Sequence, residues 1–368
     1  MTKKLSRLQL TQERAEAVAK KTNETINELG GHSSSLYTLL TNIQLLFARI
    51  RNVPDESRLK YEEIKAVGLS WKQQVNQIQI EYKKAEVKIT GSGAVGVGTG
   101  VAGAAMGPTI AMGIATTIGT ASTGTAISTL SGAAATNAAM AWLGGGTVAA
   151  GGGGVAAGSF ILALTGPVGI TVAAVSLAAS GLILFKKNTD KAKLEDVYTL
   201  ISNRDIKLFE LAIVELNERI TKIGQESKKL ARAIKRIESF GTEYTFMTEA
   251  QQYELGTYLN LMLSSTQLLV NPIAGLQPRY SERDFSELCE NEQVSDLGYF
   301  KTHKPMIMAL ANLLYKIELD EKDEKLLLES LRLNKEFLAS IQMSKKDFSL
   351  QSMAMVERAL SRAYTNGF

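Results

Sequence analysis

The feature that most constrains this chain is a stretch of 97 consecutive residues, Ile89 to Phe185, that contains no Asp, Glu, Lys, Arg or His. Soluble domains carry about one charged residue in four, so a gap of this length needs a physical cause. The usual cause is contact with lipid hydrocarbon, where a charge is costly to bury. We therefore predict that residues 89–185 insert into a membrane.

The composition of this stretch indicates how it would associate in lipid. Glycine supplies 22 of its 97 residues, and four glycines at spacings of four, three and four form one helical stripe, a glycine zipper. Small residues on such a stripe let helix backbones approach closely. Ser159–Phe185 is the best single span, because 27 residues suffice to cross a hydrocarbon core about 30 Å thick, and Ala94–Thr117 is a weaker one. The residues predicted to insert, with Trp142 as an interfacial side chain, are Gly96, Gly100, Gly103, Gly107, Trp142, Phe160, Ile161, Leu162, Val172, Val175, Leu182, Ile183, Leu184 and Phe185.

Lysines flank the uncharged stretch on both sides. The excess of basic residues at cytoplasmic loops places both ends on the same side of a membrane, which requires an even number of crossings. Two crossings are predicted, although the length also permits four. The alternative is a buried hairpin or glycine-rich insert that never meets lipid, because glycine and threonine weaken insertion and the mean hydropathy is only −0.01. The flanking basic residues are Lys83, Lys84, Lys88, Lys186 and Lys187.

Long helices are predicted on both sides of the stretch. Residues 194–240 contain apolar positions at alternating spacings of three and four from Ile206 to Ile237, which is the seam of a coiled coil. Its expected partner is the seam from Ile64 to Ile89. A further stripe runs from Leu36 to Ile50, and Gly30-Gly31 is expected to end a first helix over residues 4–29.

These patterns predict an all-α protein. We expect a long antiparallel helical bundle or coiled coil, a central Gly/Ala-rich apolar hairpin and a C-terminal helical region. The predicted parts are an N-terminal helical arm (1–88), the membrane-inserting segment (89–185), a long coiled-coil helix (186–240) and a C-terminal region (241–368). The two arms carry net charges of +5 and +4 and the C-terminal region −5, which gives the total of +4. The clearest helix of the last part is 326–341.

Enzymatic chemistry has no support in the sequence. The Gly91–Gly96 match to GxGxxG lacks the acidic residue that a dinucleotide site needs about twenty positions later. The two histidines, His32 and His303, are far apart, and the single Cys289 lies between acidic residues. We expect no catalytic site, cofactor or metal. We expect no nucleic-acid partner, since the basic residues are mixed with acids and lack an aromatic-basic cluster.

The N-terminus carries basic residues but no apolar run after them, so we expect no cleavable signal peptide. We predict synthesis as a soluble cytoplasmic protein that acts at a membrane, either of a target cell or of its own cell.

The arrangement of helical arms, a central apolar hairpin (89–185) and a long returning helix resembles the α-helical pore-forming toxins of the cytolysin A and haemolysin BL type. This resemblance covers residues 1–240 in layout and includes no diagnostic motif. It implies a soluble helical protein that hides an apolar tongue, inserts it and forms a homo-oligomer in the lipid bilayer, with companion subunits as a further option. The alternative function is a resident membrane-anchored coiled-coil scaffold whose C-terminal region recruits a partner.

Overall fold

The computed structural model describes residues 7–91, 188–276, 279–290, 294–334, 337–338, 341 and 343–366. Helices make up most of these residues, and the described part of the chain contains no β-strand beyond one isolated bridge between Arg51 and Glu243. The prediction of an all-α protein is therefore confirmed. The division of the chain into four parts stays a prediction, because residues 92–187 lie outside this description.

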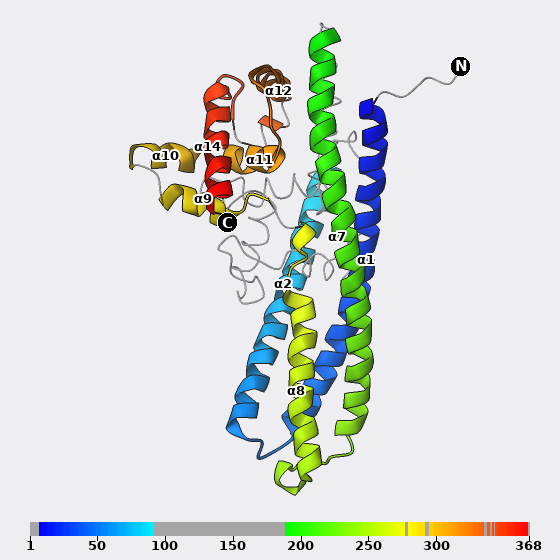
Figure 1. The fold of residues 1–368 in the computed structure, drawn as a ribbon. Coiled ribbons are helices and arrows are strands. Elements are labelled where there is room, and N and C mark those ends of the chain that lie inside the picture. Colours follow the sequence, from blue (N-terminus) through cyan, green and yellow to red (C-terminus); the bar gives the residue numbers. More distant parts are fainter. Residues whose placement is uncertain are drawn as a thin grey trace, which may run out of the picture.

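Four long helices lie side by side (Figure 1): α1 (Arg7–Arg49), α2 (Asp55–Gly91), α7 (Asn188–Ile237) and α8 (Glu249–Val270). Contacts between α1 and α7 advance together along both helices, from Leu8 with Glu195 to Arg14 with Glu210, so these two helices run in the same direction. Helices α2 and α8 return in the opposite direction.

One hydrophobic core joins these four helices, which we call the long-helix core. Trp71 is its largest buried side chain, and the Tyr37 ring lies 5.4 Å from it between centroids. The seam predicted for α7 is largely buried here: Leu216, Ile223 and Leu230 are fully inaccessible. Of the α2 seam, Ile64, Trp71 and Val75 are buried, whereas the side chains from Ile78 onward, apart from Gln79 and Ile80, lie outside the described residues.

The prediction that Gly30-Gly31 ends a helix is wrong, because α1 continues through both glycines for 43 residues. Each glycine costs a helix interior about 1 kcal/mol relative to alanine, and the long contact with α7 outweighs this cost. The buried positions Thr22, Ile26, Leu29, Ser33 and Leu36 follow one another at spacings of four, three, four and three, so the buried face of α1 passes through the glycines without a shift.

The expected pairing of α7 with residues 64–89 is also corrected for the part of α2 whose side chains the structure describes. Helix α7 contacts α1 along its length, whereas α2 packs mainly against α8. An apolar seam specifies that a helix is buried but does not identify the neighbour, and here the long parallel contact with α1 takes that place.

The two turns at the lower end in Figure 1 are joined to each other. The Arg51 N–H donates to the Thr242 carbonyl (2.8 Å), and the Tyr244 N–H donates to the Arg51 carbonyl (3.1 Å). The Asn52 side chain donates to Glu243 (2.7 Å). We call this end, formed by residues 50–54 and 238–248, the closed end. It fixes the α1–α2 hairpin against the α7–α8 hairpin.

Shorter helices follow α8. They are η4 (Ala274–Leu276), α9 (Glu282–Glu290), α10 (Val294–Thr302), α11 (Lys304–Leu314), α12 (Glu321–Leu333) and α14 (Leu350–Asn366). Helices α9 to α14, which we call the C-terminal helices, form a second hydrophobic core that also includes Leu8 and the first turns of α7. The helix predicted over 326–341 ends at Leu333, because Asn334 accepts from the Phe337 N–H (2.8 Å) and begins a new turn.

Candidate functional site

The predicted membrane-inserting residues, from Gly96 to Phe185, lie outside the described residues, as do Lys186 and Lys187. Lys83, Lys84 and Lys88 belong to the last turns of α2, but their side chains are not part of the description. The structure therefore bears on this candidate site through the two helices that bracket it.

The two helices that bracket the uncharged segment both meet it on the side away from the closed end, although α2 ends well before the level at which α7 begins (Figure 1). Helix α2 starts at the closed end and runs away from it to Gly91, whereas α7 runs from Asn188 toward the closed end. The bracketing residues Gly91 and Asn188 therefore both lie on the side of the long helices away from the turns. This arrangement is compatible with an even number of membrane crossings.

The start of α7, directly after the segment, is held by the rest of the protein. One face of α7 carries Tyr198, Asp205, Ala212, Arg219 and Glu226, which recur every seven residues. Going from the start of α7 toward the closed end, the C-terminal helices, then η4 and then α8 cover this face. The C-terminal helices thus occupy the position along α7 that α8 leaves free when it ends at Val270.

The middle of this face is tightly fitted. A Cβ added at Gly275 would lie 2.9 Å from the Ala212 Cβ, so only glycine permits η4 to approach so closely. Glu215 accepts from the N–H groups of Ala274 (2.9 Å) and Gly275 (3.0 Å). Arg219 donates to the carbonyls of Leu268 and Asn271 (both 2.8 Å) and ties the end of α8 to α7.

The contact between the start of α7 and the C-terminal helices, which we call the joint, has an apolar part and a polar part. Leu194, Val197, Tyr198 and Ile201 are all at most 1% exposed. The Tyr198 hydroxyl lies 2.8 Å from the hydroxyl of Ser330 in α12. Burial raises the pKa of Tyr198 to about 12. This phenol therefore stays neutral at physiological pH.

A buried charge cluster lies at the centre of the joint. Asp205 Oδ1 accepts from Arg204 Nε (2.9 Å) and from an Arg279 terminal nitrogen (2.7 Å). The Asp205 side chain is only 1% exposed. Arg204 also donates to the carbonyls of Leu313 (3.0 Å) and Tyr315 (2.6 Å) at the end of α11. Burial lowers the pKa of Arg279, and the neighbouring Asp205 carboxylate opposes this shift. Two cations therefore share one carboxylate in a largely dry setting.

An outer set of ion pairs surrounds the joint. Lys193 lies 3.3 Å from Asp320 and 3.5 Å from Asp323, and Lys322 lies 3.5 Å from Asp190. The hydrogen bond to Asp320 raises the pKa of Lys193. Asp320 caps α12 by accepting from the Asp323 N–H (2.7 Å), and this hydrogen bond is the main cause that lowers the pKa of Asp320. These exposed pairs orient α12 on α7 but stabilise the contact only weakly.

The charge cluster was not predicted from the sequence. The sequence did contain a signal for it. Asp205 continues the helical stripe formed by Leu194, Tyr198 and Ile201, so an acidic residue stands where the spacing calls for an apolar one. A charge at such a position indicates a buried ion pair, but the sequence does not identify Arg279 as the partner.

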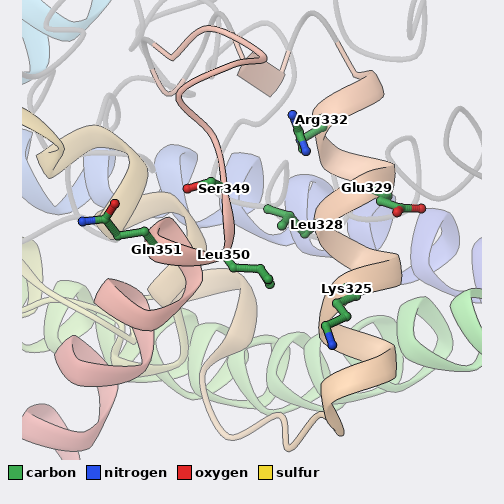
Figure 2. Close-up of a pocket in the computed structure, with 7 residues that line it drawn as sticks. All are labelled: Lys325, Leu328, Glu329, Arg332, Ser349, Leu350 and Gln351. Atoms are coloured by element: carbon green, nitrogen blue, oxygen red, sulfur yellow. The ribbon is translucent and has the colours of Figure 1, made fainter.

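A surface groove of about 490 Å³ lies between α12 and the start of α14 (Figure 2). Lys325, Glu329 and Arg332 contribute from α12, and Leu350 and Gln351 from α14. Arg332 is held by the Lys345 carbonyl (3.2 Å). The lining combines both signs of charge with two apolar side chains, Leu328 and Leu350.

Within the described residues, no group of three or more His, Cys, Asp or Glu side chains could hold a metal ion. Among the helices that the structure describes, none combines the length and the apolar character needed to cross a membrane. Comparison with protein-family models, with curated proteins and with solved structures finds no match to this chain.

Proposed function

We propose that this protein permeabilises membranes by inserting residues 89–185 and oligomerising, as a toxin component or as a cell-death or defence effector. The observation that carries the proposal is the uncharged stretch of 97 residues between two strongly charged helices. Hydrocarbon is the environment that best accounts for such a gap. The resemblance in layout to the α-helical pore-forming toxins supports the same function.

The placement of the bracketing helices supports insertion as a hairpin. Since α2 runs away from the closed end and α7 runs back toward it, both connections to the segment lie on the side away from the closed end, as insertion from one face of a bilayer requires. Glycine stripes such as Gly96–Gly107 would bring the inserted helices into close contact. The long helices would then hold neighbouring protomers in register as a coiled coil.

Dye release from liposomes by detergent-free protein tests the proposal. Wild type is compared with Gly100→Glu and Val172→Lys, which place a charge in each predicted span. The matched controls are Asn42→Glu and Asn76→Lys, at exposed positions of α1 and α2. We expect wild type and controls to release dye and both segment variants to fail, because a charge at the centre of a span costs about 3 kcal/mol or more.

The alternative, a resident membrane-anchored scaffold, predicts a different outcome in the same experiment. A scaffold needs detergent for extraction and floats with liposomes without releasing dye. Absence of both dye release and flotation would refute membrane function for residues 89–185.

A further inference from the structure

The outward surface of α8, which we call the α8 face, lies between α2 and α7 (Figure 1). No charged residue occurs in this helix from Leu255 to Val270, although one side of it is open to water. The exposed side of a surface helix is ordinarily charged or strongly polar. The α8 face is therefore suited to burial against a further helix. Its exposed positions in this stretch are Gly256, Thr257, Asn260, Leu263, Ser264 and Gln267.

Two strongly exposed aromatic side chains lie where α8 begins. Tyr253, in the second turn of α8, is 79% exposed, and Phe246, at the end of η3 (Tyr244–Phe246), is 89% exposed. Within the part of the chain that the structure describes, these are the two most exposed large hydrophobic side chains. Protein interfaces are enriched in tyrosine and phenylalanine, and tyrosine is frequent among the residues that carry binding energy. The α8 face therefore has the composition of a protein–protein contact.

The two edges of the α8 face carry opposite charges. On the α2 side, Glu56 and Glu63 are exposed and lie seven positions apart. On the α7 side, Lys229 and Arg236 also lie seven positions apart, and their side chains are 55% and 53% exposed. From α2 through α8 to α7, the surface is thus acidic, uncharged and basic in turn.

Contacts within the bundle place these charges at matching heights. Arg236 donates to Glu254 (3.0 Å) and so lies level with this residue of α8. Lys60 donates to Asn260 (2.6 Å), so Glu56, four residues before Lys60, lies level with position 256 of α8. At a rise of about 1.5 Å per residue, Glu56 and Arg236 are about 3 Å apart along the bundle axis. The equal spacing on the two helices then gives the second acidic and basic residues matching heights as well.

A two-fold axis parallel to α8 makes this surface complementary to itself. Such an axis sets the α2 edge of each copy against the α7 edge of the other, so Glu56 meets Arg236 of the second copy and Glu63 meets its Lys229. Asn260, at the centre of the face, meets Asn260 of the second copy, and a carboxamide both donates and accepts. A central asparagine fixes the register of coiled coils in the same way. A two-fold axis perpendicular to α8 would set acid against acid.

We propose that the α8 face binds the α8 face of a second copy of this chain, with the long helices of the two copies parallel. The contact is isologous, because the same surface is used by both copies. It identifies the partner surface in the oligomer of the function proposed above, and it rests on that function only in this assignment, since the association itself requires no membrane.

Sedimentation equilibrium of the full-length chain, without detergent or lipid, tests the association. Wild type should form a reversible dimer, and Tyr253→Ala should raise the dissociation constant at least about thirtyfold, because it removes an aromatic anchor of the contact. The control is Leu45→Ala, which truncates a side chain 55% exposed on α1 and should change the constant at most about twofold. A wild type that stays monomeric up to about 100 μM, or equal weakening by both variants, would overturn the proposal.

Cross-linking of single cysteines tests the parallel arrangement. Tyr253→Cys, Asn260→Cys and Gln267→Cys are each made in a Cys289→Ser background and treated with a short bis-maleimide. These positions recur every seven residues along the proposed axis, so each should link to its own counterpart. Leu45→Cys, as the control, should not link. Linking at position 260 alone, together with links between positions 253 and 267, would show an antiparallel contact and overturn the arrangement.

Charge reversal tests the pairing of the two edges. Glu63→Lys and Lys229→Glu should each weaken the dimer, since each places like charges across the contact, and the double variant should restore association. Weakening that adds in the double variant would contradict the pairing of these two residues.

The two proposals fail in distinguishable ways. A monomeric wild type in sedimentation overturns the dimer, whatever the liposomes show. A dimeric wild type that releases no dye overturns permeabilisation and leaves the α8 face as a dimer contact. A monomer that floats with liposomes only while Tyr253 is present would overturn the dimer and assign the α8 face to the lipid surface.

Discussion

Replacing Asp205 by Asn is the sharpest single perturbation of the joint. The substitution preserves the shape of the side chain and removes its charge. Two guanidinium groups, on side chains only 14% and 16% exposed, then remain within 2.8 Å of an uncharged group. Breaking a buried ion pair on one side costs about 3–5 kcal/mol. Arg204 keeps its carbonyl acceptors at Leu313 and Tyr315, so we expect the lower end, about 3 kcal/mol.

The loss of stability should be local, so it is measured at the joint itself. Hydrogen exchange of residues 194–205, compared with wild type, gives the change in the free energy of local unfolding there. The matched control is Asp55→Asn, because Asp55 also accepts from an arginine, Arg58 (2.9 Å), but on side chains 83% and 68% exposed. Its effect on stability should stay within about 0.5 kcal/mol. A loss below about 1 kcal/mol for Asp205→Asn, or an equal loss for both variants, would refute the claim that burial makes the Asp205 ion pairs stronger than the exposed Asp55 pair.

Three further predictions test other parts of the structure. Burial raises the pKa of Tyr198 to about 12, whereas an unfolded tyrosine ionises near pH 10. Between these two values the unfolded state loses a proton that the folded state keeps, so wild type should lose about 2 kcal/mol relative to Tyr198→Phe as the pH rises from 10 to 12, measured by urea denaturation. Parallel stability curves would contradict this. Gly275→Ala should destabilise the protein by about 1–3 kcal/mol because its Cβ would meet Ala212. Gly256→Ala, which has open space around it, should stabilise α8 by up to about 1 kcal/mol. Thermal unfolding compares the two variants, and equal melting temperatures would contradict the close fit at Gly275. Thr248→Ala removes the capping box of α8 and should lower the free energy of unfolding by about 1 kcal/mol in the same assay. An unchanged melting temperature would contradict a stabilising role for this cap.

The all-α class and the long helices could be predicted from periodicity. The helix predicted over residues 194–240 matches α7, Asn188–Ile237, to within six residues at its start and three at its end, and the ten regularly spaced positions from Ile206 to Ile237 define one face of it. The Gly30-Gly31 break was wrong because local propensity costs only about 1 kcal/mol per glycine, whereas a helix the length of α1 buries many side chains against α7.

Partner choice could not be predicted in the same way. The seams of α1, α2 and α7 are all apolar, and nothing in their spacing states which of them meet or in which direction. The Asp205–Arg279 pair joins residues 74 positions apart, and the glycine that permits η4 to approach Ala212 is one of 31 in the chain. Such contacts depend on the assembled backbone and not on any local pattern.

The depth of position 172 in a bilayer tests the central claim most directly. Val172→Cys in a Cys289→Ser background carries an environment-sensitive fluorophore, and Asn76→Cys on the exposed face of α2 serves as the control. On addition of liposomes, the account predicts a blue shift at position 172, quenching there by lipid-borne quenchers, and neither change at position 76. An emission at position 172 that stays water-like and open to aqueous quenchers would contradict insertion of the uncharged segment.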